Sequence, residues 1–296
     1  MNMLAQKYSS YSNELIDEIT KAVSDYNKIK NKIPKGERDF NAERCMEENW
    51  KPFCGKIKNS VKFKLSGANF LLRDGDNPFD LLKKFVDEAN LPYPAVVFEI
   101  DSFVTLDCQN APTIILLEQV DDLIFMSLAI KGNSWSIVEI NGKSMQMIFN
   151  RKTLDLKMDI SSDQLTDEQK QGIANNYFSV VFGLFVSFIC ALSCKNTKIE
   201  DSPIQQSSVK NSIRKSKGKL PFFTHKILTI DGVRSEKKNP NGGSHASPRV
   251  HLRRGHIRRL ENKNVWVNSC VVGDKSKGMV SKDYAVDSQL LKGGAA

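Results

Sequence analysis

The sequence predicts an α+β protein: N-terminal helices and an antiparallel sheet, then a buried apolar helix and a basic β-rich C-terminal module. Three observations support this prediction. Apolar residues near the N-terminus recur at helical spacing. After Pro94 the chain changes to short runs rich in β-branched and aromatic residues, which are typical of strands. A long uncharged stretch then precedes a segment dominated by positive charge.

The N-terminal segment is predicted to be helical from Tyr8 to Ile29, because apolar residues three and four positions apart share one helix face. Pro34 ends this helix. The lysine-rich stretch 51–64 gives no assignment. A short helix is predicted within residues 77–92, where an Asn-Pro pair begins it and a proline closes it.

Five runs after Pro94 predict the strands of an antiparallel meander, because Asp, Asn and Gly separate them as in hairpins. These runs are AVVFEID, TIILLEQV, LIFMSLAI, WSIVEING and MQMIFN. In the first run, Glu99 and Asp101 alternate with apolar residues. The alternation predicts a solvent-exposed face, which we prefer to the alternative of an acid–base pair.

The uncharged stretch from Gln171 to Cys194 predicts the longest apolar helix, with a capping-box pattern from Thr166 to Gln169 at its start. The apolar core YFSVVFGLFVSFICALSC would span about 27 Å at about 1.5 Å per residue, so a membrane span is the alternative. A helix buried between a sheet and other helices explains the same composition without export of the preceding region. We therefore expect a core helix and no membrane partner.

Positive charge is concentrated near the C-terminus. Residues 209–296 hold 19 Lys and Arg against 6 Asp and Glu, a balance of +13, so the rest of this +9 chain carries −4. A concentrated basic region attracts polyanions and releases counterions when it neutralises phosphates. We expect an α+β domain at residues 1–201 and a basic β-rich nucleic-acid-associated module at residues 202–296, which begins with an exposed connection at 202–219.

The segment 249–259 carries the sharpest functional signal, with five arginines and two histidines in 11 residues. A guanidinium binds phosphate through two parallel hydrogen bonds and stacks on bases. The alternation before Gly255 is typical of an extended strand, although we expect the stretch 237–263 as a whole to be a loop between strand-like runs. The predicted nucleic-acid-binding residues are Arg249, His251, Arg253, Arg254, His256, Arg258 and Arg259.

The strand-like runs around this segment cover residues 221–231, 264–274 and 278–286. Their aromatic residues are candidates for stacking on nucleic-acid bases. These residues are Phe222, Phe223, Trp266 and Tyr284.

Other chemistries are open for the same histidines. His251 and His256 are the candidate catalytic residues of a metal-independent ribonuclease, as general acid and base beside the arginines. Zinc binding by His245, His251, His256 and Cys270 has suitable donors but no standard spacing. We favour plain binding without catalysis, and expect no metal site and no cofactor.

The cysteines and the N-terminal residues indicate the cellular compartment in which the protein works. The six cysteines form no CxxC pair, and the first residues show no cationic segment followed by an apolar one. We expect the protein to work in a reducing cytoplasm, that of a host bacterium if it comes from a phage.

The pattern RVHLRRGHIRRL followed by VWVNSCVVGD resembles the C-terminal signature of a phage anti-CRISPR family that acts on the type V-A effector. KGKLPFFTHKILTI, the helix ending in ALSCKN and LPYPAVVFEID are similar to further family features, whereas the N-terminal half diverges. The resemblance implies recognition of a target's nascent N-terminal peptide and loss of the encoding messenger RNA. It carries over to His251, Arg253, Arg254, Gly255 and His256, while Arg258 and Arg259 lie where the family pattern varies.

We therefore expect a phage- or mobile-element-encoded inhibitor of host defence, in which residues 1–201 recognise the target and the basic module acts on RNA or the ribosome. The alternatives are a general RNA- or ribosome-binding accessory protein and a membrane-anchored adaptor that uses the apolar helix.

Overall fold

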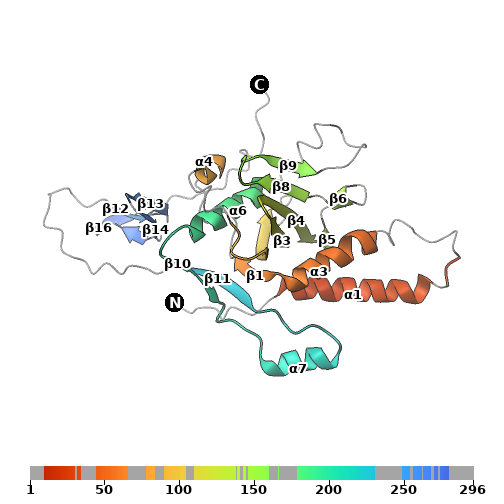
Figure 1. Ribbon diagram of the computed structural model, residues 1–296. Helices are drawn as coiled ribbons and strands as arrows, with labels where there is room; N and C mark the ends of the chain where they lie inside the picture. The colour runs from red at the N-terminus through yellow and green to blue at the C-terminus, as the bar shows by residue number, and fades with distance from the viewer. Residues whose placement is uncertain are drawn as a thin grey trace. The chain divides into compact units, whose positions relative to one another are not determined.

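The computed structural model (Figure 1) describes residues 10–30, 32–34, 45–65, 78–83, 90–104, 110–137, 139–140, 143–144, 146–159, 166, 179–230, 249–253, 256–261, 263–267, 270–272 and 274–279. Helices combine with a mixed sheet of 9 strands, which confirms the α+β fold class.

The main sheet has the strand order β10-β11-β1-β2-β3-β4-β8-β9, with β5 paired to β4. From β2 to β9 neighbouring strands are antiparallel, as predicted, but β5 and β8 both pair with β4, so the strand order departs from a simple meander. The strands are β1 (Val61–Leu65), β2 (Ala95–Val104), β3 (Asn110–Val120), β4 (Leu123–Lys131), β5 (Trp135–Ile137), β8 (Gln146–Asn150), β9 (Leu156–Asp159), β10 (Thr197–Asp201) and β11 (His225–Ile230).

Strand β1 makes the sheet mixed, because it pairs parallel with both β2 and β11. A parallel pair needs a long connection, and the short helix α4 (Pro78–Leu82), as predicted, lies in the stretch between β1 and β2. The unassigned stretch 51–64 forms α3 (Lys51–Asn59) and most of β1. The run WSIVEING divides into β5 and β6 (Glu139–Ile140), and β6 pairs with β7 (Lys143–Ser144).

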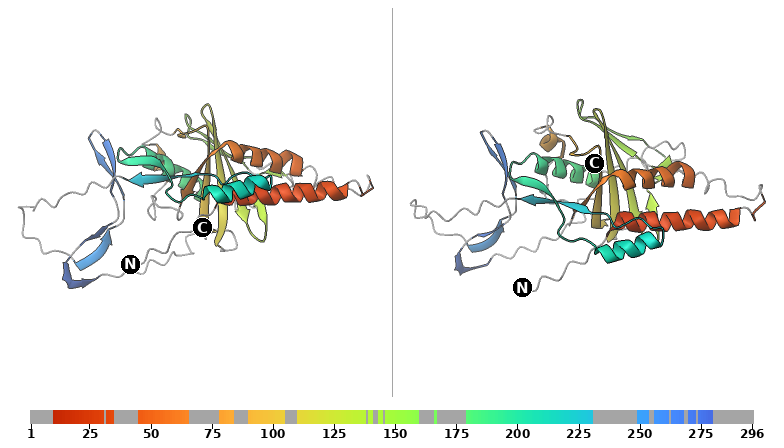
Figure 2. Two further views of the ribbon diagram at one scale, coloured as in Figure 1. Left: turned by 90° about the horizontal axis from the view of Figure 1, so that it is seen from below. Right: turned by 60° about the horizontal axis from the view of Figure 1, so that its bottom comes forward.

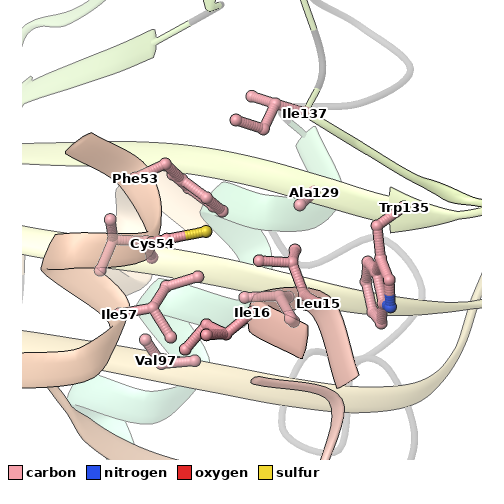
Figure 3. Close-up of a cluster of buried hydrophobic side chains, with 11 residues drawn as sticks. Leu15, Ile16, Phe53, Cys54, Ile57, Val97, Ala129, Trp135 and Ile137 are labelled. Carbon is pink, nitrogen blue, oxygen red and sulfur yellow. The ribbon is translucent and has the colours of Figure 1, made fainter. Parts of the chain in front are cut away.

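Helices α1 (Tyr11–Lys30) and α3 cover one face of the sheet, and the π-helix η2 (Cys45–Trp50) leads into α3. Figure 3 shows their buried side chains meeting those of the sheet. The predicted N-terminal helix is confirmed from Tyr11, whereas Tyr8 lies outside the described residues. The shared core consists of Leu15, Ile16, Phe53, Cys54, Ile57, Val97, Ile114, Leu116, Ala129, Trp135 and Ile137.

Helix α6 (Ser179–Leu192) covers the opposite face of the sheet. The ring of Phe188 lies 5.0 Å from that of Phe63 and 4.8 Å from that of Phe98, whose strand neighbour Val97 points to the other face. The predicted core helix is therefore confirmed over Ser179–Leu192, whereas residues 171–178 of the prediction lie outside the described residues. None of the helices in the described ranges is long and apolar enough to span a membrane. Gln169 of the capping-box pattern lies outside those ranges.

The chain groups into two compact units. Residues 1–189 and 199–227 form unit 1, and residues 190–198 and 228–296 form unit 2. Segment 199–227 belongs to unit 1 because the start of β11 pairs with β1 and Arg214 binds Asp17 of α1. The expected division into residues 1–201 and 202–296, with a role for each part, stays a prediction.

Two segments that the sequence predicted to be irregular contain regular structure. In the connection 202–219, the Ser207 side chain accepts a hydrogen bond from the Lys210 amide and caps α7 (Ser208–Ser216). The predicted loop 237–263 contains β12 (Arg249–Arg253) and β13 (His256–Leu260). The connection 202–219 is largely exposed, as predicted, but contains a capped helix, and β12 confirms the extended strand predicted before Gly255. The prediction that 237–263 as a whole is a loop was wrong, because strand pairing organises a stretch whose composition is typical of a loop. The following runs form β14 (Lys263–Val267), β15 (Cys270–Val272) and β16 (Asp274–Met279).

Candidate nucleic-acid interface

The arginine-rich segment supplies two strands of unit 2. Strand β12 lies between β15, to which it is antiparallel, and β16, to which it is parallel. Strand β13 forms a hairpin with β14 that closes at the pair Leu260 and Lys263. A hairpin fixes the register of its strands, so the arginines of β13 have defined neighbours on β14.

Six of the seven predicted nucleic-acid-binding residues lie on these strands. In the backbone register, Arg249 is opposite Asp274, His251 opposite Val272 and Arg253 opposite Cys270. On the hairpin, His256 is opposite Val267, Arg258 opposite Val265 and Arg259 opposite Asn264. Arg254 lies outside the described residues.

Arg258 is the predicted binding residue whose side chain the structure describes, and this side chain is exposed. Leu260, two positions further on β13, is 41% exposed, and its partner Lys263 is also exposed. Because alternate residues and cross-strand partners share one face of a hairpin, this face presents two cations to solvent.

The side chains of His251 and His256 lie outside the part of the structure that is described, so neither the catalytic nor the zinc alternative is tested. The backbone partners of His251 and His256 are both valines, and β12 and β13 belong to different sheets. Over the described ranges no group of three or more His, Cys, Asp and Glu residues is placed to hold a metal. His245, from the zinc alternative, lies outside those ranges. The ribonuclease alternative stays a prediction.

Two of the four expected stacking residues, Phe222 and Phe223, contact cations of the protein itself. The Arg214 guanidinium lies 4.5 Å from the centre of the Phe222 ring, and the Lys62 ammonium lies 3.9 Å from that of Phe223. Both rings therefore bind cations of unit 1. Trp266 is on β14, opposite Ile257, and Tyr284 lies outside the described residues.

A buried polar cluster in unit 1 corrects the prediction for Glu99, whose side chain is 0% exposed. One carboxylate oxygen, Oε2, lies 2.9 Å from His225 Nε2 and accepts a hydrogen bond from the Tyr11 amide at 2.9 Å. The other, Oε1, accepts hydrogen bonds from the Ser12 amide at 2.9 Å and from Ser10 Oγ at 3.3 Å. Asp101 is exposed as predicted.

The carboxylate of Glu99 stays ionised in this setting. Burial pushes its pKa up, but the hydrogen bond and charge of His225 and the hydrogen bonds from Ser12 outweigh burial and leave the pKa below its ordinary value. A negative charge at a helix N-terminus is also stabilised by the positive end of the helix dipole. Glu99 thus fixes the start of α1 onto β2 and β11.

Lys62 lies on the same face, directly opposite His225 in the β1–β11 register, and is 3% exposed. Its ammonium donates hydrogen bonds to the backbone oxygens of Lys58 at 3.2 Å and Ser60 at 2.5 Å, beside the end of α3. Burial lowers its pKa to about 8, although the charge of Glu99 acts in the opposite direction. The cluster ties α1, α3, β1, β2 and β11 together and is shielded from solvent, so we assign it a structural role.

The fold defines the protein as an α+β sheet unit with helices on both faces, joined to a unit of small basic sheets. A family model matches residues 74–261: the AcrVA2-like, anti-CRISPR type V subtype A2 family. The chain therefore belongs to this family and is an inhibitor of CRISPR defence. The match runs from just before α4 to the end of β13. No curated protein and no solved structure matches the chain.

Proposed function

We propose that this inhibitor lowers expression of a CRISPR defence protein through its messenger RNA, with the arginine-bearing strands of unit 2 in contact with RNA. The observation that carries the proposal is the hairpin β13–β14, where Arg258 and Lys263 are exposed on one face of the two paired strands. Charge supports it too, because most of the excess positive charge of the chain lies in its C-terminal part.

The physical case rests on arginine chemistry. One guanidinium group binds two phosphate oxygens through parallel hydrogen bonds. An arginine side chain also loses less conformational entropy per hydrogen bond than a lysine side chain does. Strands place such groups at a repeat of about 3.3 Å per residue, so alternate residues are about 7 Å apart. This spacing is on the scale of the distance between successive phosphates of a single strand, and the flexible backbone of RNA adapts to it.

Binding to RNA should fall steeply with salt, and replacing Arg253 and Arg258 together with alanine should reduce that dependence. Each lost phosphate contact lowers the slope of log affinity against log salt by about 0.7 for a single strand, so we expect a decrease of about 1.4. Fluorescence anisotropy with a labelled single-stranded RNA across a salt series measures this slope.

The matched control replaces Lys28 and Lys83, two exposed lysines of unit 1, with alanine. It should leave the slope unchanged. Equal slopes for the arginine variant and wild type would contradict the contact. RNA that is cut by wild type but not by a His251→Ala/His256→Ala variant would instead assign the ribonuclease role.

Recognition of the target is proposed to use its nascent N-terminal peptide, as the family resemblance implies. In cells with a type V-A effector gene, synonymous recoding of the first codons should leave silencing intact, because the peptide is unchanged. Altering the encoded residues at those codons should restore the transcript. Quantitative PCR of the effector transcript, with and without this inhibitor, distinguishes recognition of the peptide from recognition of the codons. Silencing that follows the codons rather than the residues would refute peptide recognition.

A further inference from the structure

Contacts among the described residues hold helix α7 against the rest of unit 1 by one of its sides. Arg214 donates from its two terminal nitrogens to the Asp17 carboxylate at 2.8 and 2.9 Å, and from Nε to the Leu220 carbonyl oxygen at 2.5 Å. Asn211, one turn earlier, accepts a hydrogen bond from the Phe222 amide through its side-chain oxygen at 2.8 Å. In Figures 1 and 2, α7 lies beside α1 at the surface of this unit.

These contacts keep α7 helical without a partner. A helix of nine residues is unstable alone in water, so α7 depends on its caps and on Arg214. Ser207 caps its start, and Gly218, with a φ of 67°, turns the chain back after its end. Burial acts to raise the pKa of Asp17, but its hydrogen bonds with Arg214 and Lys219 outweigh burial and lower it, so the carboxylate remains charged.

The side turned away from unit 1 carries an apolar ridge. Val209 is 66% exposed and Ile213 is 50% exposed, and they are one turn apart on the same face. Lys210 borders the ridge, and Lys215 and Lys217 are exposed toward the end of the helix. The ridge is thus a small aliphatic surface within a strongly basic one.

The stability of the fold does not account for this ridge. Valine and isoleucine are weaker helix formers than alanine or lysine, because branching at Cβ restricts their rotamers. For a residue in the core, burial of apolar surface offsets the lower helix propensity. The side chains of Val209 and Ile213 are mostly in contact with water and gain little from burial. Because they lie one turn apart on a helix held by its other side, the two side chains are available to contact another molecule.

We propose that α7 docks the ridge of Val209 and Ile213 against the apolar face of an acidic amphipathic helix on a partner protein. An apolar centre with a charged rim is the ordinary composition of a protein interface, and helices pack through rows of side chains one turn apart. The lysines of α7 complement the carboxylates.

Two other partners fit less well. RNA phosphates would pair with the lysines but leave both aliphatic side chains in water. A membrane surface would accept the aliphatic side chains, but two of them are far fewer than the apolar face of an interfacial helix provides. The proposal is independent of the RNA contact in unit 2.

The test titrates the full chain with a labelled synthetic amphipathic peptide of leucine and glutamate, monitored by anisotropy. We expect Val209→Ser/Ile213→Ser to weaken binding at least tenfold, because serine removes the aliphatic surface and keeps a similar helix propensity. Lys210→Glu/Lys215→Glu should weaken binding and flatten its salt dependence. The control Val120→Ser changes a valine that is 56% exposed on β3 and should have no effect.

Circular dichroism and the thermal midpoint of each variant check that α7 still folds. Arg214→Ala, which keeps the ridge but frees the helix, should also weaken binding. No binding of the peptide by wild type, or equal binding by the Val209→Ser/Ile213→Ser variant, would overturn the proposal. So would competition by poly(A) RNA or by phosphatidylglycerol vesicles that depends on Val209 and Ile213. The RNA salt slope of the α7 variants should equal that of wild type, which separates this test from that of the proposed function.

Discussion

Replacing Glu99 with alanine should lower the free energy of unfolding by about 3–5 kcal/mol, the cost of removing one partner from a buried ion pair. The substitution leaves His225 and the Tyr11 and Ser12 amides without their acceptor in a site closed to water. Urea denaturation followed by circular dichroism measures the loss.

Two variants test whether the effect comes from the buried cluster. Asp101→Ala, two residues along the same strand, removes an exposed carboxylate that pairs with Lys64, and should cost less than about 1 kcal/mol. In a His225→Ala background, Glu99→Ala should cost less than it does in wild type, because the ion pair is already lost. Strictly additive losses would show that Glu99 and His225 do not interact.

Because of the same carboxylate, the free energy of unfolding should depend on pH. Because its folded pKa lies below the unfolded value, Glu99 contributes its full stabilisation above pH about 4.5 and loses it as pH falls through the folded pKa. The stability difference between wild type and Glu99→Gln should therefore shrink as the pH falls below about 4.5. A difference that does not change with pH would mean that Glu99 is neutral in the folded protein.

Replacing Phe188 with alanine should also destabilise unit 1 by about 3–5 kcal/mol, because it leaves a cavity between α6 and the sheet. The ring of Phe188 contacts those of Phe63 and Phe98, and all three side chains are fully buried. Aromatic pairs of this geometry contribute beyond the area that they bury. Urea denaturation in aqueous buffer measures the effect.

Phe188→Leu, which keeps most of the apolar volume, should cost less than Phe188→Ala. Val120→Ala, at an exposed position, should stay within about 0.5 kcal/mol of wild type. Unchanged stability of Phe188→Ala would contradict the role of α6 as the core layer and favour the membrane-anchored alternative.

The regular patterns of the sequence predicted the larger elements well. Helical spacing placed α1, alternating and β-branched runs placed the strands from β2 to β8, and the uncharged stretch placed α6. These elements form wherever a continuous apolar pattern must be buried, so local sequence is enough to find them. The family resemblance, drawn from short motifs, agrees with the family match over residues 74–261.

Predictions that depended on single polar residues were less secure. Alternation around Glu99 is the same whether the polar side faces water or another element, and the partners of Glu99 come from α1 and β11. The basic connection that became α7 has a lysine- and serine-rich composition typical of a loop. Its helix is held by Asp17, a residue far away in sequence.

By itself, the sequence determined the α+β class, the buried α6, the concentration of positive charge and the family. Tertiary structure alone decided that β1 and β11 join the sheet in parallel, that Glu99 is a buried ion-pair partner of His225, and that α7 turns Val209 and Ile213 toward solvent. The reason is physical: periodicity and charge are local properties of a chain, whereas a pairing partner or an exposed face exists only once distant segments meet.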